Sequence, residues 1–269
     1  MQHPGQIGAL VLAAGRGSRM QSNIPKVLHK VQDKTMLEHV LHSLEKACIQ
    51  DKTLVLSQNL EPFHPILTSH PNLRACTQKN PMGTGHAVAS AAAAYHHLAP
   101  APYAVTQLVK GTPSNADFVL ICTGDTPALK AETISTFLDA CQTKKTDFAV
   151  LGMDTPSPFG YGRLVMRDDS VLKIVEERDA NEQEKSITFC NTGVLFANIK
   201  ILSSLLTKLR PQNAQNEYYL TDCVHHAQLQ GISVYGHITP QWQDFLGVNT
   251  AEELAHITSY MEKRSCAEL

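Results

Sequence analysis

Short apolar runs alternate along the first half of the chain with segments whose apolar residues recur at helical spacing. Residues 7–12 are almost continuously apolar, which is typical of a strand buried on both faces of a parallel sheet. In residues 36–48 the apolar side chains stand at positions 36, 37, 40, 41, 44 and 47, which is the stripe of an amphipathic helix. The pattern predicts that buried strands and covering helices alternate from the beginning of the chain.

The same alternation continues over about half of the sequence. We expect further strands at 53–56, 73–77, 117–122 and 147–152, with helices at 86–98 and 131–141. Such an order predicts an α/β fold with a doubly wound, mostly parallel, Rossmann-like sheet and right-handed crossovers. Ligands bind sheets of this kind at the carboxyl ends of the strands. The loops after the predicted strands should therefore converge on one site.

The second half of the chain has a different pattern. Residues 162–166 and 171–176 are predicted to form a hairpin, because the intervening Asp168-Asp169-Ser170 is a turn signal. We further expect a strand at 189–197, a helix at 218–230, a strand at 232–236 and a closing helix at 250–263 with Thr250 as its N-cap. This half is interpreted as a smaller mixed region that closes over the first.

Residues 99–116 interrupt the alternation. The segment is rich in proline and glycine at its ends, and a loop of this length is uncommon inside a compact domain. We interpret it as a solvated surface insertion, with a flap or a partner contact as the alternative.

Composition and charge exclude several classes of function. The chain has 269 residues, of which 43% are hydrophobic, and its net charge of -2 provides no general attraction to nucleic acid or to an anionic membrane. The seven cysteines are odd in number and scattered without a C-x-x-C motif, which argues against a disulfide framework and a zinc site. No 18-residue apolar run and no signal-peptide pattern occurs. We expect a cytoplasmic protein that binds any anion through a local cluster.

A glycine-rich turn with cations follows the first predicted strand. Gly15-Arg16-Gly17 comes directly after the apolar run, and Arg19 and Lys26 follow closely. Free backbone N–H groups without a nearby Cβ, together with adjacent cations, are what a phosphate site requires. A plain tight turn is the alternative, but such a turn has no use for the basic residues. The stretch therefore favours an anion site.

A candidate metal ligand follows another buried strand. Gly124-Asp125 comes after the apolar residues 117–122, so Asp125 could be a turn residue or a ligand of Mg²⁺, which takes few protein oxygens besides phosphates and water. Asn249 could supply a second, neutral oxygen. Local sequence patterns cannot pair two residues so far apart, and the pairing depends on the resemblance given next.

Short motifs spread over residues 10–249 resemble those of the sugar nucleotidyltransferases, most closely the N-terminal uridyltransferase domain of the bifunctional GlmU enzymes. In chain order they are Leu12-Ala-Ala-Gly-Arg-Gly-Ser-Arg-Met20, Pro25-Lys-Val-Leu-His29, Gln78 with Gly83-Thr-Gly-His-Ala87, Gly124-Asp125, Gly160-Tyr-Gly-Arg163, Ile174-Val-Glu-Glu-Arg-Asp-Ala180, Asn191-Thr-Gly193, Asn213-Ala-Gln215, Glu217-Tyr-Tyr-Leu-Thr-Asp222 and Gly247-Val-Asn249. The first marks the wider superfamily. Gly160-Tyr-Gly-Arg163 and Glu217-Tyr-Tyr219 point to the N-acetylglucosamine branch.

The resemblance implies a reaction. Uridylyl would be transferred from UTP to N-acetyl-α-D-glucosamine 1-phosphate, giving UDP-N-acetylglucosamine and pyrophosphate by a Mg²⁺-dependent in-line displacement. Residues 1–249 would form the nucleotidyltransferase domain, with a nucleotide-binding half at about 1–125 and a sugar-binding half at about 126–249, followed by a C-terminal helix at 250–269. We expect no β-helical acetyltransferase domain. The partners would be these small molecules, and the chain a monomer or weak oligomer.

The resemblance also implies roles for individual residues. Arg19 would grip the triphosphate, Lys26 would bridge phosphate groups, and Asp125 and Asn249 would hold Mg²⁺. The nucleotide would be bound by Leu12, Ala13, Ala14, Gly15, Gln78, Gly83 and Thr84. The sugar and its acetamide would be bound by Gly160 through its N–H, Glu176, Asn191, Tyr219 and Thr221.

Some of these roles have plain alternatives. Glu176 could be a solvated strand end beside Glu177, and one of Tyr218 and Tyr219 should face the core if both lie on a helix. The family's usual tyrosine before Gly-Asp is Thr123 here, which leaves the choice of sugar more open than the chemistry. The other possible functions are transfer to another sugar 1-phosphate or from another NTP, and a non-catalytic regulatory protein that binds nucleotide sugars.

Overall fold

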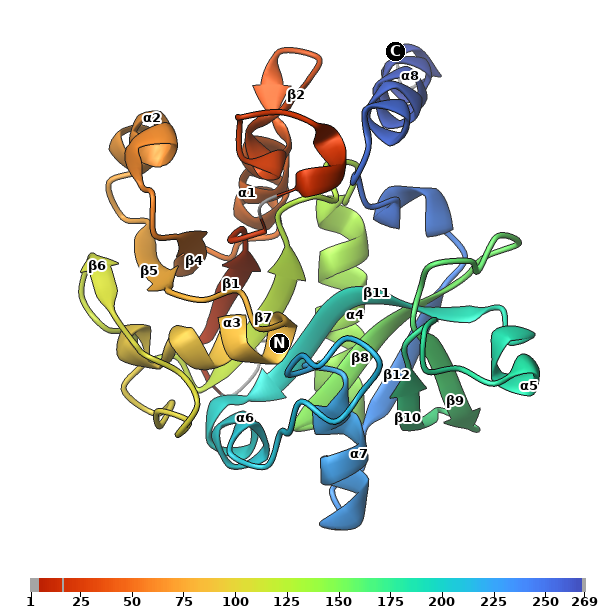
Figure 1. The fold of residues 1–269 in the computed structure, drawn as a ribbon. Helices are drawn as coiled ribbons and strands as arrows, with labels where there is room; N and C mark the ends of the chain where they lie inside the picture. The colour runs from red at the N-terminus through yellow and green to blue at the C-terminus, as the bar shows by residue number, and fades with distance from the viewer. Residues whose placement is uncertain (1–4, 16, 268–269) are drawn as a thin grey trace.

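The computed structural model describes residues 5–15 and 17–267. Strands from both halves of the chain form one large mixed sheet in it (Figure 1). Its strand order is β6-β5-β4-β1-β7-β11-β8-β12-β10-β9. The strands are β1 (Ile7–Leu12), β4 (Lys52–Ser57), β5 (Arg74–Gln78), β6 (Leu108–Lys110), β7 (Phe118–Thr123), β8 (Phe148–Asp154), β9 (Arg163–Arg167), β10 (Ser170–Val175), β11 (Phe189–Asn198) and β12 (Tyr235–Thr239). A separate two-stranded ribbon pairs β2 (Lys30–Val31) with β3 (Lys34–Thr35).

The first half forms the predicted parallel sheet. β1 pairs in parallel with β4 on one side and with β7 on the other, and β4 pairs in parallel with β5. The carboxyl ends of these strands therefore meet at one edge of the sheet. Figure 1 shows the arrowheads of β1 and β7 pointing toward the end of the molecule where α8 lies.

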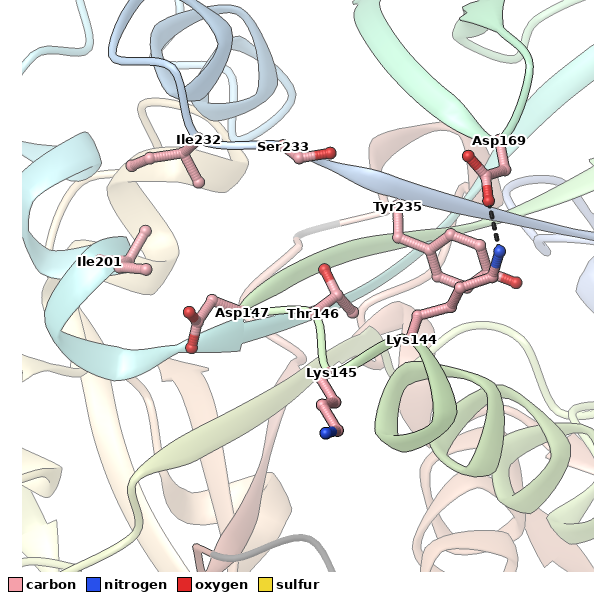
Figure 2. A pocket seen from close by; sticks show the side chains of 9 residues that line it. All are labelled: Lys144, Lys145, Thr146, Asp147, Asp169, Ile201, Ile232, Ser233 and Tyr235. Carbon is pink, nitrogen blue, oxygen red and sulfur yellow. Dashed lines mark hydrogen bonds and ion pairs between the residues drawn. The ribbon is translucent and has the colours of Figure 1, made fainter.

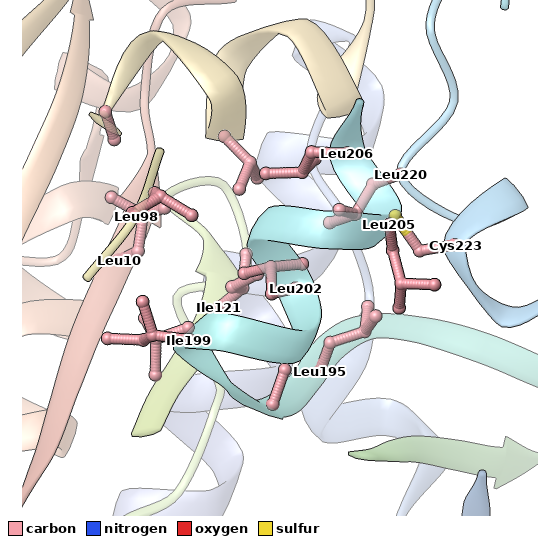
Figure 3. Close-up of a cluster of buried hydrophobic side chains, with 14 of the residues drawn as sticks. Leu10, Leu98, Ile121, Leu195, Ile199, Leu202, Leu205, Leu206, Leu220 and Cys223 are labelled. Carbon is pink, nitrogen blue, oxygen red and sulfur yellow. The ribbon is translucent and has the colours of Figure 1, made fainter. Parts of the chain in front are cut away.

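Helices cover both faces of the sheet, which confirms the doubly wound arrangement. They are α1 (Met36–Lys46), α2 (His64–Ser69), α3 (Thr84–Ser90), α4 (Ala131–Lys144), α5 (Glu182–Lys185), α6 (Ile199–Leu206), α7 (Asp222–Leu229) and α8 (Ala251–Ala267). Alternate residues of β1 face opposite ways: Ala9 and Val11 join a buried cluster with α1, α2 and α4, whereas Leu10 joins one with α3, α6 and α7. Figure 3 shows this second cluster, in which Leu10 and Leu195 of the sheet pack with Leu202 of α6.

The second half is more mixed than the predicted mostly parallel sheet. β11 pairs antiparallel with both β7 and β8, and β9 and β10 form the expected hairpin. Because β11 joins β7 to β8, the two halves of the chain share one sheet, and the second half continues the sheet of the first.

Two elements of the second half differ from the prediction for tertiary reasons. The helix expected at 218–230 begins only at Asp222, because Tyr218 and Leu220 form hydrogen bonds with the loop and helix at residues 82–85 instead. The strand expected at 232–236 begins at Tyr235, because Ile232 N–H closes the end of α7 by donating to Ala227 O.

Two predictions in residues 86–116 are corrected. The alanine-rich helix is shorter than expected, since α3 ends at Ser90 and a single 3₁₀ turn, Ala92–Ala94, follows. The 99–116 segment is only in part the solvated insertion that was expected. Half of its residues are exposed, but it also contributes the edge strand β6 and buries Ala101 and Ser114. Its apolar residues follow no period, so the sequence pattern did not predict this packing.

The closing helix α8 starts where predicted. Glu253 N–H donates to Thr250 Oγ1 at 3.1 Å, and Thr250 N–H donates back to the Glu253 carboxylate at 3.2 Å, which forms a capping box. Ile257 and Met261 bury this helix against Met20, Val31 and Met36. The packing fixes the preceding segment, residues 247–249, beside the first loops of the chain. No helix in the described part of the chain combines the length and apolar character needed to cross a membrane.

Candidate functional site

In the turn after β1, the backbone at Gly17 lies directly against the side chain of Lys26. Gly17 has φ +64°, and a Cβ at this position would lie 2.5 Å from the Lys26 Cβ. A residue other than glycine would therefore be strained and would also collide with the lysine. The second glycine of the turn thus permits the short 3₁₀ helix Lys26–Leu28 to lie directly on the turn. Gly15 has open space where its Cβ would be.

Lys26, Asp125 and Asn249 come together from three distant parts of the chain. The Lys26 ammonium forms an ion pair with the Asp125 carboxylate and donates a hydrogen bond to Asn249 Oδ1 at 2.8 Å. Only 12% of the lysine side chain and 19% of the aspartate side chain are exposed. The predicted convergence of these residues is confirmed, although the roles given to them stay predictions.

Backbone hydrogen bonds connect the end of β1, the end of β7 and the segment before α8. Gly124 N–H donates to Leu12 O at 2.9 Å, which ties the end of β7 to the end of β1. Val248 N–H donates to Asp125 O at 3.0 Å, which ties the segment before α8 to the same place. These main-chain contacts hold Gly124, Asp125 and Val248 close together, and the side chains of Asp125 and Asn249 both face the Lys26 ammonium.

The chemistry of this cluster fits a magnesium ion. A carboxylate and an amide oxygen already face one positive charge, and hard oxygens in this small number are what Mg²⁺ accepts when phosphates and water complete its shell. Among residues 5–15 and 17–267, no group of three or more His, Cys, Asp or Glu side chains could hold a metal ion. Asp125 and Asn249 are the residues that would hold the ion.

The two arginines of the turn are not both described. Arg19 is exposed on the 3₁₀ helix Ser18–Met20, and within the described residues it forms no hydrogen bond or ion pair. Arg16 lies outside the described residues. Arg19 is thus free to meet an anion in solvent at the mouth of the turn.

A cavity of about 280 Å³ opens beside the turn at the carboxyl ends of β1, β4 and β5. It is lined by Ala14, Ser57, Gln58, Asn59, Gln78, Lys79 and Pro81. Leu12 and Ala13 lie at the end of β1 behind it, where Ala13 N–H donates to Val55 O at 2.8 Å. Two predicted nucleotide residues, Ala14 and Gln78, thus line one cavity.

The side-chain amide of Gln78 is held by the Gly83 loop and by His86. Its amide nitrogen donates to Gly83 O at 3.3 Å and lies 2.9 Å from His86 Nδ1. Gly83 has φ +103°, and a Cβ there would lie 2.6 Å from Tyr218 O. Thr84 Oγ1 accepts a hydrogen bond from Leu220 N–H at 3.1 Å. The Gly83 loop therefore joins the predicted nucleotide residues to residues 218–220.

Glu176, the predicted sugar residue that directly follows β10, meets the predicted sugar residue Thr221 of the 213–222 segment. Thr221 Oγ1 donates to Glu176 Oε1 at 2.9 Å, and Tyr219 OH donates to Asp179 Oδ2 at 3.3 Å. Burial and the neighbouring carboxylates of Asp222 and Asp179 raise the pKa of Glu176, against the opposing effect of the Thr221 hydrogen bond. Tyr219 precedes α7 and is buried, so the expectation that it lies on a helix is wrong.

Asn191 stands at a bulge in β11. Its Oδ1 accepts a hydrogen bond from Gly193 N–H at 3.1 Å, and the pairing with β8 shifts between Asn191 and Val194. Gly193 has φ +82°, and its Cβ would lie 3.4 Å from Thr123 Cγ2. The bulge therefore brings the predicted sugar residue next to the Thr123-Gly124-Asp125 turn.

Gly160 N–H has a partner within the protein, and its predicted role in binding the sugar stays a prediction. Its N–H, expected to bind the sugar, donates to the Glu177 carboxylate at 3.1 Å. The same carboxylate pairs with Arg163 at 2.7 Å, and the arginine side chain is only 2% exposed. Sequence reasoning missed this pair, although Arg163 is the last residue of the Gly160 motif and Glu177 is adjacent to Glu176. The available signal was a charged residue, Arg163, directly before the apolar residues 164–166.

A further cavity lies at the opposite edge of the sheet. Figure 2 shows it, with a volume of about 450 Å³, beside the amino ends of β8 and β12. Lys144 pairs there with Asp169 at 2.6 Å, and both side chains are about half exposed. None of the predicted site residues lines this cavity. Because β8 runs parallel to the first strands, the cavity is on the side of the sheet away from Asp125.

Comparisons with known proteins agree with this geometry. Residues 9–188 match the family described as the MobA-like NTP transferase domain. The chain is 34% identical over 262 residues to the bifunctional protein GlmU of Ruegeria sp. (strain TM1040), covering 97% of this chain and 54% of that protein. It is 37% identical over 257 residues to the bifunctional protein GlmU of Lactococcus lactis subsp. cremoris (strain MG1363), covering 95% and 52%. The chain thus spans about half the length of these curated relatives.

Solved structures show the same fold at low sequence identity. A putative glucose-1-phosphate thymidylyltransferase from Bacillus anthracis, in complex with a sucrose, superimposes with a TM-score of 0.71 at 16% identity and covers 94% of both chains. A UDP-glucose pyrophosphorylase complexed with UDP-glucose gives a TM-score of 0.72 at 15% identity, covering 96% of this chain and 98% of that one.

Proposed function

Because the chain belongs to the family of MobA-like NTP transferase domains, we propose that it transfers a uridylyl group from UTP to N-acetyl-α-D-glucosamine 1-phosphate. The products would be UDP-N-acetylglucosamine and pyrophosphate. The observation that carries the proposal is the meeting of Lys26, Asp125 and Asn249 at the carboxyl ends of β1 and β7, beside a glycine turn. The similarity to proteins named GlmU supports the choice of substrates.

The reaction forms one bond and breaks another. A phosphate oxygen of the sugar phosphate attacks the α-phosphorus of UTP, and the bond from that phosphorus to the bridging oxygen of the β-phosphate breaks as pyrophosphate leaves. No covalent bond to the protein is needed, so the protein positions the groups and neutralises their charge. Lys26 supplies a nearly buried ammonium for this purpose, and Arg19 supplies a planar guanidinium at the open side.

Asp125 and Asn249 would hold Mg²⁺. When bound, this ion neutralises negative charge on the phosphates and orients them. Asp125 contributes the negative charge that binds the ion, and Asn249 contributes a neutral oxygen that adds no further repulsion toward the triphosphate. The capping box of α8 fixes the backbone at Asn249 and so the position of its amide.

The sugar phosphate would be bound by the cluster around Glu176. A carboxylate with a raised pKa and a neighbouring threonine hydroxyl are suited to accept and donate hydrogen bonds to sugar hydroxyls. The Asn191 bulge, whose Gly193 approaches Thr123, would contribute to binding of the sugar and its acetamide. Thr123 stands where the family has a tyrosine, and it is the position that leaves the identity of the sugar most open.

A pyrophosphate-release assay with a panel of substrates tests the proposal. The four common NTPs are combined with the 1-phosphates of N-acetylglucosamine, glucose and glucosamine, with Mg²⁺ present or chelated. The expected result is turnover that is fastest with UTP and N-acetylglucosamine 1-phosphate and is lost with chelator. Turnover with another pair would change the substrate. No turnover with any pair, despite tight binding of a UDP-sugar, would leave a non-catalytic binding protein.

A further inference from the structure

Both N–H groups of the Gln78 carboxamide are engaged by other residues of the protein. A carboxamide has two N–H groups, and here the nitrogen lies 3.3 Å from Gly83 O and 2.9 Å from His86 Nδ1. Gln78 is 6% exposed and lines the cavity next to the glycine turn. No hydrogen bond from the described residues reaches its oxygen. The atom that Gln78 can offer to a molecule in the cavity is therefore an acceptor only.

His86 fixes this orientation through its own protonation. The ring is 3% exposed and is hydrogen-bonded to the backbone of Tyr103. Burial lowers the pKa of His86, so the neutral ring with a single proton is favoured. A ring N–H is needed to donate to a carbonyl, and the other ring nitrogen is then an acceptor. Nδ1 can accordingly accept from the Gln78 amide, and a reversed carboxamide would set two acceptors against each other.

The 99–116 segment holds His86 in place. The Tyr103 ring stacks on the Tyr218 ring with centroids 3.9 Å apart and planes 13° apart, and its hydroxyl donates to Leu206 O at 2.7 Å. Tyr218 is in turn bonded through its backbone to Met82 and Gly85, on either side of Gly83. The segment thus closes a ring of contacts that runs from Gln78 through His86 and the two tyrosines back to the Gly83 loop.

We propose that His86, anchored by Tyr103 of the 99–116 segment, is a positioning residue that makes Gln78 select a base with a ring N–H donor. The proposal rests on the proposed function and adds to it that the base of the NTP enters the cavity lined by Ala14 and Gln78. Uracil carries a proton on the ring nitrogen N3, whereas cytosine presents a bare acceptor there and is of the same size. If the Gln78 oxygen faced N3 of cytosine, two acceptors would be left without a hydrogen bond. This costs more binding free energy than the loss of a single contact.

The test compares the binding of UTP and CTP by calorimetry, alongside turnover. His86→Leu removes both hydrogen bonds and lets the carboxamide rotate. We expect the ratio of UTP to CTP affinity to fall by about tenfold or more, and the KM for UTP to rise with a much smaller change in kcat. His86→Asn, which can return an acceptor near Nδ1, should recover much of the ratio. Tyr103→Leu should lower the ratio less than His86→Leu.

Controls separate positioning from a loss of folding and from the chemistry. His97→Leu changes an exposed histidine of the same region and should leave the ratio unchanged. If His86→Leu unfolds the protein, His86→Asn and Tyr103→Leu still report the ratio. An unchanged ratio in the folded variants, or a wild type without preference for UTP over CTP, overturns the inference. A wild type that prefers UTP in binding but does not use N-acetylglucosamine 1-phosphate contradicts only the proposed function.

Discussion

The ammonium nitrogen of Lys26 lies 2.8 Å from the amide oxygen of Asn249, a residue 223 positions further along the chain, and the same ammonium pairs with Asp125. The lysine therefore occupies the place between two oxygens where a divalent cation would be bound. Two cations repel each other at such a distance, so the lysine and a metal compete for the same oxygens. This relationship connects the metal and the phosphate roles proposed for the site.

Replacing Lys26 should affect metal binding and turnover in opposite directions. In Lys26→Met the competing charge is lost, so Mg²⁺ should bind more tightly in calorimetry without substrate. The loss of a cation that neutralises the triphosphate should lower kcat by about a hundredfold, with a far smaller rise in the KM for the sugar phosphate. Lys30→Met, on an exposed lysine nearby, serves as the control. An unchanged kcat would remove Lys26 from the mechanism.

Asp125 should be required for the metal and dispensable for the fold. Asp125→Ala removes the carboxylate that pairs with Lys26 at the proposed cation position, so Mg²⁺ binding should weaken strongly and kcat should fall by at least about a hundredfold. The backbone bond from Val248 N–H to Asp125 O does not depend on the side chain and should persist. Circular dichroism and a Mg²⁺ titration check both points, with Asp139→Ala of α4 as the comparison. Near-native kcat in Mg²⁺ would contradict the metal role.

The two glycines of the first turn should respond differently to alanine. Gly17→Ala meets both a left-handed backbone and the Lys26 Cβ, so it should lower the free energy of unfolding by about 2 kcal/mol and displace the lysine. Gly15→Ala has open space and should leave the unfolding free energy nearly unchanged while weakening UTP binding, because the added methyl group occupies the turn itself. Urea unfolding and UTP calorimetry measure the two effects. Equal stability losses in both variants would contradict the geometry.

The raised pKa of Glu176 predicts a pH-dependent stability difference. A carboxyl whose folded pKa is raised takes up a proton more readily in the folded protein, so its ionised form destabilises the fold as the pH rises above the unfolded value near 4.5. Glu176→Gln removes this charge and still accepts from Thr221. The melting temperature of the variant should exceed that of the wild type at pH 8, and the difference should shrink as the pH falls toward about 4.

The same variant should bind the sugar phosphate more weakly, since a neutral amide accepts hydrogen bonds less strongly than a carboxylate. Glu182→Gln, on a glutamate whose side chain is 91% exposed, should change neither property. A Glu176→Gln variant that is less stable than the wild type at pH 8 would show that the hydrogen bond outweighs the cost of the buried charge.

Most of the first half of the fold could be predicted from periodicity. Continuous apolar runs and helical stripes depend only on which side chains must be buried, and β1, β4, β7 and α1 lie close to their expected ranges. The predicted start of the helix at residue 218 was wrong because backbone groups there form hydrogen bonds with residues far away in the chain. Tyr218 and Leu220 form hydrogen bonds with residues 82–85 in place of helical ones. Nothing local in the sequence distinguishes these choices.

Local patterns in the sequence were enough to predict the layered α/β architecture, the glycine turn with its cations and the set of polar residues at strand ends, because burial and backbone conformation depend on a few neighbouring residues. The folded arrangement was needed to learn that Lys26 stands between Asp125 and Asn249, that the Gln78 amide nitrogen bonds His86, and that the Tyr103 ring of the 99–116 segment stacks on Tyr218. Contacts of this kind join residues that the chain separates by tens to hundreds of positions. Their geometry exists only once the sheet has aligned the ends of its strands.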